Sequence, residues 1–289
     1  MSNITWRENE TALGKSNLVY TVVFSCIMVV GLPLNTVSLC TLLCRHSLKS
    51  SNVVFLVNLA LSDLLLIISL PMRTYFYATG TWPFSVSACI STVMLFRNNI
   101  RSSSIFITMI SMDRLLAVVY PLRSRHLRTA SIAWKSVVVV WLFLLVMNIP
   151  ESVELWRGLK NSSDVACFGF PRQNWKEAIP YFQPVLVLIL LAINIVSTAL
   201  VSWTIHRHLD SPARGINKVN IMVIFSLNLM MFTIFFLPMT LSILIKNWTP
   251  ALKPLICLAS VNCCLDPLLY YFSLEGFWRK KEDSHAMDS

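Results

Sequence analysis

Residues 53–78, VVFLVNLALSDLLLIISLPMRTYFYA, form an apolar run long enough to cross a lipid bilayer. A membrane-spanning helix needs about 20 mostly apolar residues. Six further stretches meet this requirement, and together the seven predict spans at 18–44, 53–78, 87–119, 132–150, 178–205, 219–246 and 251–272. The sequence therefore predicts an all-α membrane protein built as a seven-transmembrane helix bundle.

The composition excludes the common classes of soluble protein. Of the 289 residues, 55% are hydrophobic and 13% are charged, whereas soluble domains carry about 25% charged residues. Only 7 residues are glycine, which excludes a glycine-rich phosphate-binding protein. A net charge of +10 would suggest nucleic-acid binding in a soluble domain, but in a membrane protein it reports how basic residues are distributed across the bilayer. We expect membrane lipids, and no nucleic acid, among the partners.

Basic residues and glycosylation sequons agree on the orientation of the chain. Lys and Arg are more frequent in the loops and tail that become cytoplasmic when the N-terminus is outside, as the positive-inside rule requires. The sequons at Asn3, Asn9 and Asn161 are then all extracellular. This orientation divides the chain into an extracellular tail over 1–17, a membrane domain over 18–272 and a cytoplasmic end over 273–289.

The cytoplasmic end is predicted to start with a short amphipathic eighth helix. Phe277 and Trp278 lie beside Arg279, Lys280 and Lys281, a pattern typical of a helix lying on the inner leaflet. A solvated basic tail is the alternative. All connections between spans are short and no nucleophile–base set is present, so an enzyme is not expected.

Two of the eight cysteines are predicted to form a disulfide. Six lie within spans or at their ends and are expected to pack as free thiols. Cys89, at the top of the third span, and Cys167, in the loop before the fifth, both face the oxidising side. Their disulfide would tie that loop to the third span and shape the mouth of the bundle. No Cys/His cluster has zinc spacing.

Polar residues within the spans predict a cation site. Asp63 and Asp266 lie deep in apolar sequence, where an isolated carboxylate needs a cation or a proton. Asn99, Ser103 and Asn262 also lie within spans and add amide and hydroxyl oxygens. Such an oxygen-rich cage suits a hard monovalent cation such as sodium. A protonated, hydrogen-bonded packing network is the alternative.

Three arginines in the outer half of the bundle predict an anion site. Arg97 and Arg101 are four residues apart and share a helix face, and Arg73 follows Pro71 near the outer end of the second span. No acidic residue lies in the outer half of any predicted span. Unpaired arginines facing a cavity indicate an anionic guest, because guanidinium binds phosphate or carboxylate bidentately. Snorkelling to lipid headgroups is the alternative.

An ordered series of motifs spans the whole chain and resembles the rhodopsin-like (class A) G-protein-coupled receptors. The motifs are Asn35, Leu61-Ser62-Asp63, Cys89, Asp113-Arg114, Trp141, Cys167, Pro238 and Asp266-Pro267-Leu268-Leu269-Tyr270. Within that class the chain most resembles the purinoceptor-like lysophosphatidic acid receptors, types four to six and type five above all. The runs that carry this closer resemblance are Gly31–Asn35, Leu70–Tyr77, Tyr120–Arg125, Cys167–Phe170 and Asn262–Phe277.

The resemblance implies a plasma-membrane receptor for an anionic lipid, lysophosphatidic acid, that signals through heterotrimeric G proteins. Arg73 would contact the ligand phosphate, with Tyr77 beside it and Lys246 and Lys253 as further basic contacts. Asp63, Asn99, Ser103, Asn262 and Asp266 match the sodium pocket of the class. Asp113 and Arg114 lie at the cytoplasmic mouth, where Arg114 would bind the G protein.

Several positions depart from the family pattern. Arg97 and Arg101 are not arginine in it, which suggests an additional or altered anion preference. Leu115 follows Asp113-Arg114 where tyrosine is usual, and Asn194 stands where the fifth span usually has its proline. A receptor for a small carboxylate or a nucleotide therefore remains an alternative. A silent or decoy binder and a small transporter are more distant ones.

Overall fold

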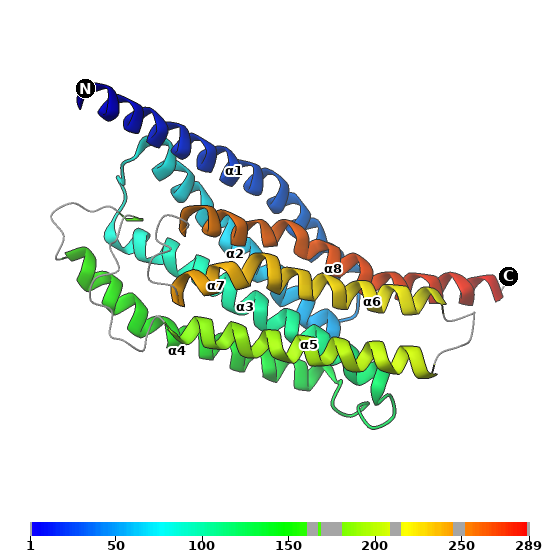
Figure 1. Ribbon diagram of the computed structural model, residues 1–289. Helices are drawn as coiled ribbons and strands as arrows, with labels where there is room; N and C mark the ends of the chain where they lie inside the picture. The colour runs from blue at the N-terminus through cyan, green and yellow to red at the C-terminus, as the bar shows by residue number, and fades with distance from the viewer. Residues whose placement is uncertain (1, 161–166, 169–180, 209–214, 245–251, 288–289) are drawn as a thin grey trace.

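The computed structural model describes residues 2–160, 167–168, 181–208, 215–244 and 252–287 as a bundle of long helices (Figure 1). Each of the seven predicted spans corresponds to a helix that is long and apolar enough to cross a membrane. The helices are α1 (Ser2–Arg45), α2 (Ser51–Thr79), α3 (Val86–Val119), α4 (Ala130–Lys160), α5 (Phe182–His208), α6 (Gly215–Met230), α7 (Leu237–Leu244) and α8 (Leu252–Met287). A π-helical segment, η3 (Met231–Phe236), joins α6 to α7 within the sixth span.

Local sequence sets the ends of the central helices. The Ser85 hydroxyl, at the N-cap of α3, accepts a hydrogen bond from the Ala88 amide at 3.2 Å, which satisfies one of the free donors of the first turn. Gly80 ends α2 in the left-handed conformation with φ of 70°, and its amide donates to the Phe76 carbonyl at 2.8 Å. Glycine tolerates this backbone without a steric penalty.

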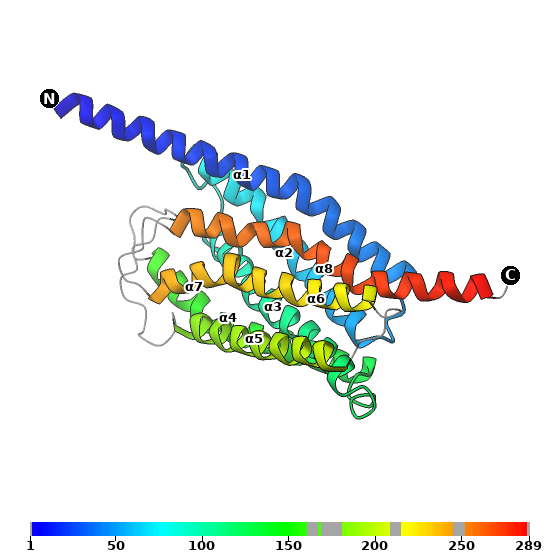
Figure 2. The same cartoon turned by 45° about the vertical axis from the view of Figure 1, so that its right-hand side comes forward.

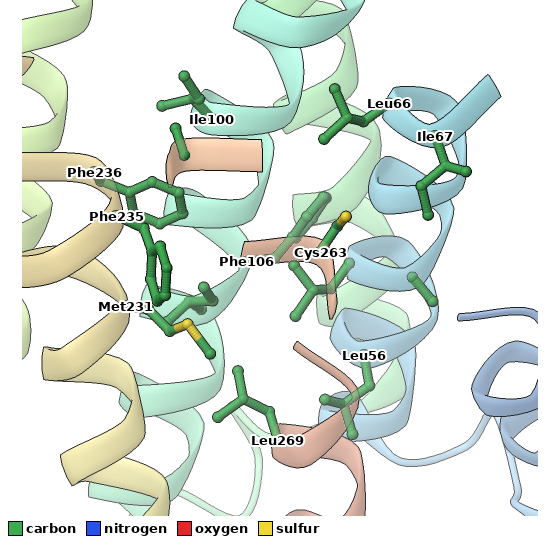
Figure 3. Packing of buried hydrophobic residues seen from close by; sticks show 14 of the residues in the cluster. Leu56, Leu66, Ile67, Ile100, Phe106, Met231, Phe235, Phe236, Cys263 and Leu269 are labelled. Atoms are coloured by element: carbon green, nitrogen blue, oxygen red, sulfur yellow. The ribbon is translucent and has the colours of Figure 1, made fainter. Parts of the chain in front are cut away.

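The helices α2 and α3 lie in the middle of the bundle. Within its most apolar stretch 78% of α2 is buried, against 22% for α1, α4 and α5. The outer helices therefore present Val and Leu side chains to the surrounding lipid, and polar residues of α2 and α3 face other helices. Side chains from α2, α3, η3 and α8 meet in the apolar centre, among them Leu56, Phe106, Met231 and Cys263 (Figure 3).

The predicted ends of three spans differ from the helices observed. The fourth span was expected to end at residue 150, but α4 continues to Lys160 and so contains Glu151. The first helix begins at Ser2, ahead of the expected residue 18, although its apolar stretch is Asn17–Arg45. The separate eighth helix is not shown, because α8 continues unbroken to Met287 and extends beyond the bundle, at the end opposite to the N-terminus (Figure 2).

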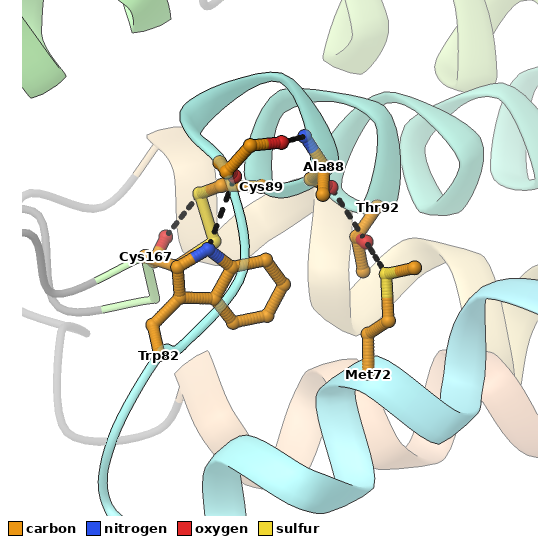
Figure 4. Close-up of a disulfide and its surroundings, with 7 residues drawn as sticks. Met72, Trp82, Ala88, Cys89, Thr92 and Cys167 are labelled. Atoms are coloured by element: carbon orange, nitrogen blue, oxygen red, sulfur yellow. Dashed lines mark hydrogen bonds between the residues drawn. A yellow bond between two sulfur atoms is a disulfide. The ribbon is translucent and has the colours of Figure 1, made fainter.

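The predicted disulfide between Cys89 and Cys167 is present and ties the segment between α4 and α5 to the start of α3 (Figure 4). Both cysteines are buried in a small apolar cluster with Leu155 and Leu159 of α4. The indole of Trp82 donates a hydrogen bond to the Ser85 carbonyl at 3.2 Å in the same region. The disulfide therefore holds Phe168, the next residue, at the mouth of the bundle.

Candidate functional site

Arg73 is a buried cation surrounded by aromatic rings. Its side chain projects from α2 and the residue is 2% exposed. The guanidinium carbon lies 4.8 Å from the ring centre of Phe96, 4.7 Å from that of Phe168 and 5.8 Å from that of Phe24. No acidic residue in the described part of the chain forms an ion pair with it, and its Nε and Nη1 atoms have no hydrogen-bond partner. Aromatic faces stabilise the charge only in part, so the arginine retains the capacity to bind an anion.

Tyr77 and Lys253 lie next to this cation. Tyr77, one helical turn above Arg73, stacks on Phe24 with ring centres 5.6 Å apart. The Lys253 ammonium, at the start of α8, is 5.9 Å from the centre of the Tyr77 ring. The structure thus brings together three of the six residues predicted to contact ligand. Lys246 lies outside the described residues, as do Asn161 and the side chains of Asn3 and Asn9.

Arg97 and Arg101 are ion-paired, and the expectation that they lack an acidic partner is wrong. Nη1 of Arg97 lies 3.1 Å from Oε2 of Glu151, and Nη2 of Arg101 hydrogen bonds to Oε1 of the same carboxylate. The side chains of Arg101 and Glu151 are only 1% and 3% exposed. Glu151 directly follows residue 150, where the sequence predicts the end of the fourth span. A carboxylate at this position is the feature of the sequence that indicates the ion pair, because predicted helix ends carry an error of several residues.

The three arginines occupy two separate sites that face different neighbours of α3. Phe96 of α3 faces Arg73 on α2, whereas Arg97 and Arg101 face Glu151 on α4. Successive residues of a helix are rotated by about 100°, so Arg97 cannot share the direction of Phe96. The guanidinium of Arg101 also lies 5.8 Å from the ring centre of Phe182 on α5. Arg73 therefore forms the candidate ligand site without the other two.

The five residues predicted to bind sodium are buried in the middle of the bundle. The Asn99 amide donates to Oδ1 of Asp63 at 2.9 Å and to the Ser103 hydroxyl at 3.3 Å. The Asn262 amide donates to Oδ2 of Asp266 at 2.8 Å.

Four oxygens of this cluster have no hydrogen-bond partner: Asp63 Oδ2, Asn99 Oδ1, Asn262 Oδ1 and Asp266 Oδ1. Buried acceptors without donors are costly, and oxygen ligands are those that hard cations prefer. The residues present therefore fit a sodium ion.

Asp113, near the C-terminal end of α3, is held by residues that the sequence did not identify. Oδ1 and Oδ2 accept hydrogen bonds from Arg128 at 3.2 and 3.3 Å, and the Ser51 hydroxyl donates to Oδ1. Arg128 lies in the segment that connects α3 to α4. Sequence spacing cannot predict this pair, because the path of the loop decides which of its basic residues returns to α3. Asp113 and Arg114 are adjacent on α3, at the end of the bundle where the sequence predicts that a G protein binds.

Comparisons with known proteins identify the family of the chain. A family model described as 7 transmembrane receptor (rhodopsin family) matches residues 34–270. The lysophosphatidic acid receptor 5 of Mus musculus is 33% identical over 90% of this chain and 76% of its own length. The human lysophosphatidic acid receptors 4 and 6 are each 30% identical, over 93% and 88% of this chain and 79% and 80% of their own lengths.

The match begins in α1 at residue 34, covers α2 to α7 and reaches Tyr270 in α8, a region that contains Arg73, Asp63 and Asp113. The relatives of this chain are signalling receptors and not enzymes, as the sequence predicts. The chain belongs to the rhodopsin family of seven-transmembrane, G-protein-coupled receptors.

Proposed function

We propose that this receptor binds lysophosphatidic acid through Arg73 and signals across the plasma membrane to a heterotrimeric G protein, with its N-terminus outside the cell. The observation that carries the proposal is the buried, unpaired guanidinium of Arg73 with two free donor atoms. Its relatives include receptors named for this lipid.

The geometry of Arg73 suits a phosphate monoester. Rings of Phe96 and Phe168 lie against the guanidinium at 4.8 and 4.7 Å, which leaves its N–H groups available to phosphate oxygens. Such charge-assisted hydrogen bonds are stronger than neutral ones and are often bidentate. Lys253, above Tyr77, supplies a second positive charge for a dianionic headgroup, and apolar surfaces of the outer half take the acyl chain.

Replacing Arg73 by Ala is expected to reduce the potency of lysophosphatidic acid more than tenfold. The loss of a charge-assisted hydrogen bond costs about 1.5–3 kcal/mol. The measurement is the concentration dependence of G-protein nucleotide exchange at matched surface expression. Arg157→Ala is the matched control, because Arg157 lies on the exposed outer end of α4 and pairs with Glu154. Unchanged potency in Arg73→Ala would remove the proposed site.

The small-carboxylate alternative loses its main support. It depended on Arg97 and Arg101 being available, and both are paired with Glu151. The same exchange assay, run with small carboxylates and nucleotides, tests it directly. Exchange in response to any agonist separates a receptor from a silent binder, and substrate flux would identify a transporter.

We further propose that sodium binds among Asp63, Asn99, Ser103, Asn262 and Asp266 and favours the arrangement of α2, α3 and α8 described here. A bound sodium ion would supply the positive charge that two buried carboxylates need. Raising NaCl is then expected to lower the affinity for agonist in the wild type but not in Asp63→Asn. Radioligand competition measures this effect. N-methylglucamine chloride at equal ionic strength controls for screening, and equal effects of the two salts would contradict a specific site.

A further inference from the structure

Three polar side chains join α3, α5 and α6 in the cytoplasmic half of the bundle. Ser111, Asn194 and Asn228 are each fully buried. The Ser111 hydroxyl donates to Oδ1 of Asn194 at 2.6 Å, and the Asn228 amide donates to the Ser111 hydroxyl. The Asn194 amide donates to the Thr108 hydroxyl at 2.8 Å. We refer to Ser111, Asn194 and Asn228 as the three-helix cluster.

Ser111 is the centre of the cluster, because its hydroxyl donates to α5 and accepts from α6. Each of these bonds crosses between helices that are distant in sequence. In a membrane, polar groups without partners are unfavourable, and interhelical hydrogen bonds contribute to helix association. Removing one hydroxyl would therefore weaken two interhelical connections at once.

The cluster lies directly beside a segment of the sixth span that can bend. Asn228 comes three residues before Met231, where the π-helical segment η3 begins, and Pro238 follows that segment. π-helical turns and prolines both interrupt the regular hydrogen bonds of an α-helix. The cytoplasmic half of the sixth span is thus connected to its outer half by a deformable segment.

On the cytoplasmic side of Asn228, the described side chains of α6 make apolar contacts with α3 and α5. The contacts form a small cluster around Leu115, Val201 and Phe225, which is separate from the main core; Val118, Val119, Ile205 and Ile221 pack against it. Among the described residues, the three-helix cluster supplies the side-chain hydrogen bond between the cytoplasmic half of α6 and α3.

We propose that the three-helix cluster positions α6 against α3 and limits signalling in the absence of ligand. Asn194 stands where related receptors usually have a proline, and its side chain makes the α5 connection possible. The cluster binds no ligand; its residues act through the position of α6. The effect on signalling rests on the proposed coupling to a G protein, whereas the effect on helix position does not.

The first test compares Ser111→Ala, Asn228→Leu and the double variant, purified in lipid nanodiscs without ligand. Each single variant is expected to raise basal nucleotide exchange roughly threefold or more, the factor that one interhelical hydrogen bond typically contributes. The fold increase in basal exchange of the double variant should be smaller than the product of the two single fold increases, because both changes remove the same bond. Ser104→Ala is the matched control: Ser104 is equally buried on α3, but its hydroxyl bonds the Arg101 carbonyl of its own helix.

The second test measures helix position without a G protein. Spin labels at two exposed positions, Tyr120 at the end of α3 and Val219 of α6, report the distance between the two helices. The background has serine in place of the exposed Cys26, Cys40 and Cys44. A longer distance in Ser111→Ala, with an unchanged distance in Ser104→Ala, supports the proposal. This holds even if no agonist produces exchange, because a missing response to agonist counts only against the proposed function. An unchanged distance in Ser111→Ala overturns it. If Asn228→Leu fails to fold, Ser111→Ala still decides the outcome.

Discussion

Replacing Glu151 by Gln is expected to destabilise the receptor by about 3–5 kcal/mol, because two arginines lose their buried counter-ion. Glu151 is 3% exposed and accepts hydrogen bonds from both Arg97 and Arg101. The variant keeps the shape of the side chain and removes only its charge. The apparent Tm of the purified receptor should fall by on the order of 10 °C. It is measured as the temperature at which half of the receptor no longer remains monodisperse after heating.

Glu154→Gln provides the matched control. Glu154 lies on the same helix and pairs with Arg157 at 3.1 Å, but the Arg157 side chain is 58% exposed. Exposed pairs contribute about 0–1 kcal/mol, so this variant should leave the Tm nearly unchanged. The double variant Arg101→Met, Glu151→Met should recover much of the loss, because replacing a buried pair by apolar groups is often neutral. Equal effects of Glu151→Gln and Glu154→Gln would contradict the buried ion pair.

Replacing both Cys89 and Cys167 by Ser is expected to cost about 2–5 kcal/mol of stability and to reduce agonist potency. The disulfide closes a loop between residues 78 apart in sequence. It also holds Phe168, whose ring centre lies 4.7 Å from the guanidinium of Arg73. Loss of the bond therefore acts on both the fold and the candidate ligand site.

Two further variants separate these effects. Phe168→Ala keeps the disulfide and should lower potency with little change in Tm. Cys40→Ser removes an exposed free thiol and should change neither quantity. A double cysteine variant with unaltered potency would show that the loop does not shape the ligand site.

The sequence by itself determined the features that depend on local geometry. Apolar length fixed the seven spans. Asn99 with Ser103 and Asn262 with Asp266 are pairs four residues apart, a spacing that a helix alone brings together, and each pair is hydrogen bonded. The disulfide followed from having two cysteines on the oxidising side. The order of motifs along the chain was sufficient to indicate the family, which the comparisons confirm.

Tertiary structure decided the pairing between helices. Glu151 with Arg101, Arg128 with Asp113, and Asn194 with Ser111 each depend on the rotation and axial position of two packed elements. The same rotation placed Arg73 and Arg97 in different sites, although both were expected to face one anion. Backbone hydrogen bonds set the spacing along a helix, so that spacing can be predicted from sequence. Contacts between helices arise from packing over their whole length, and no short motif encodes that packing.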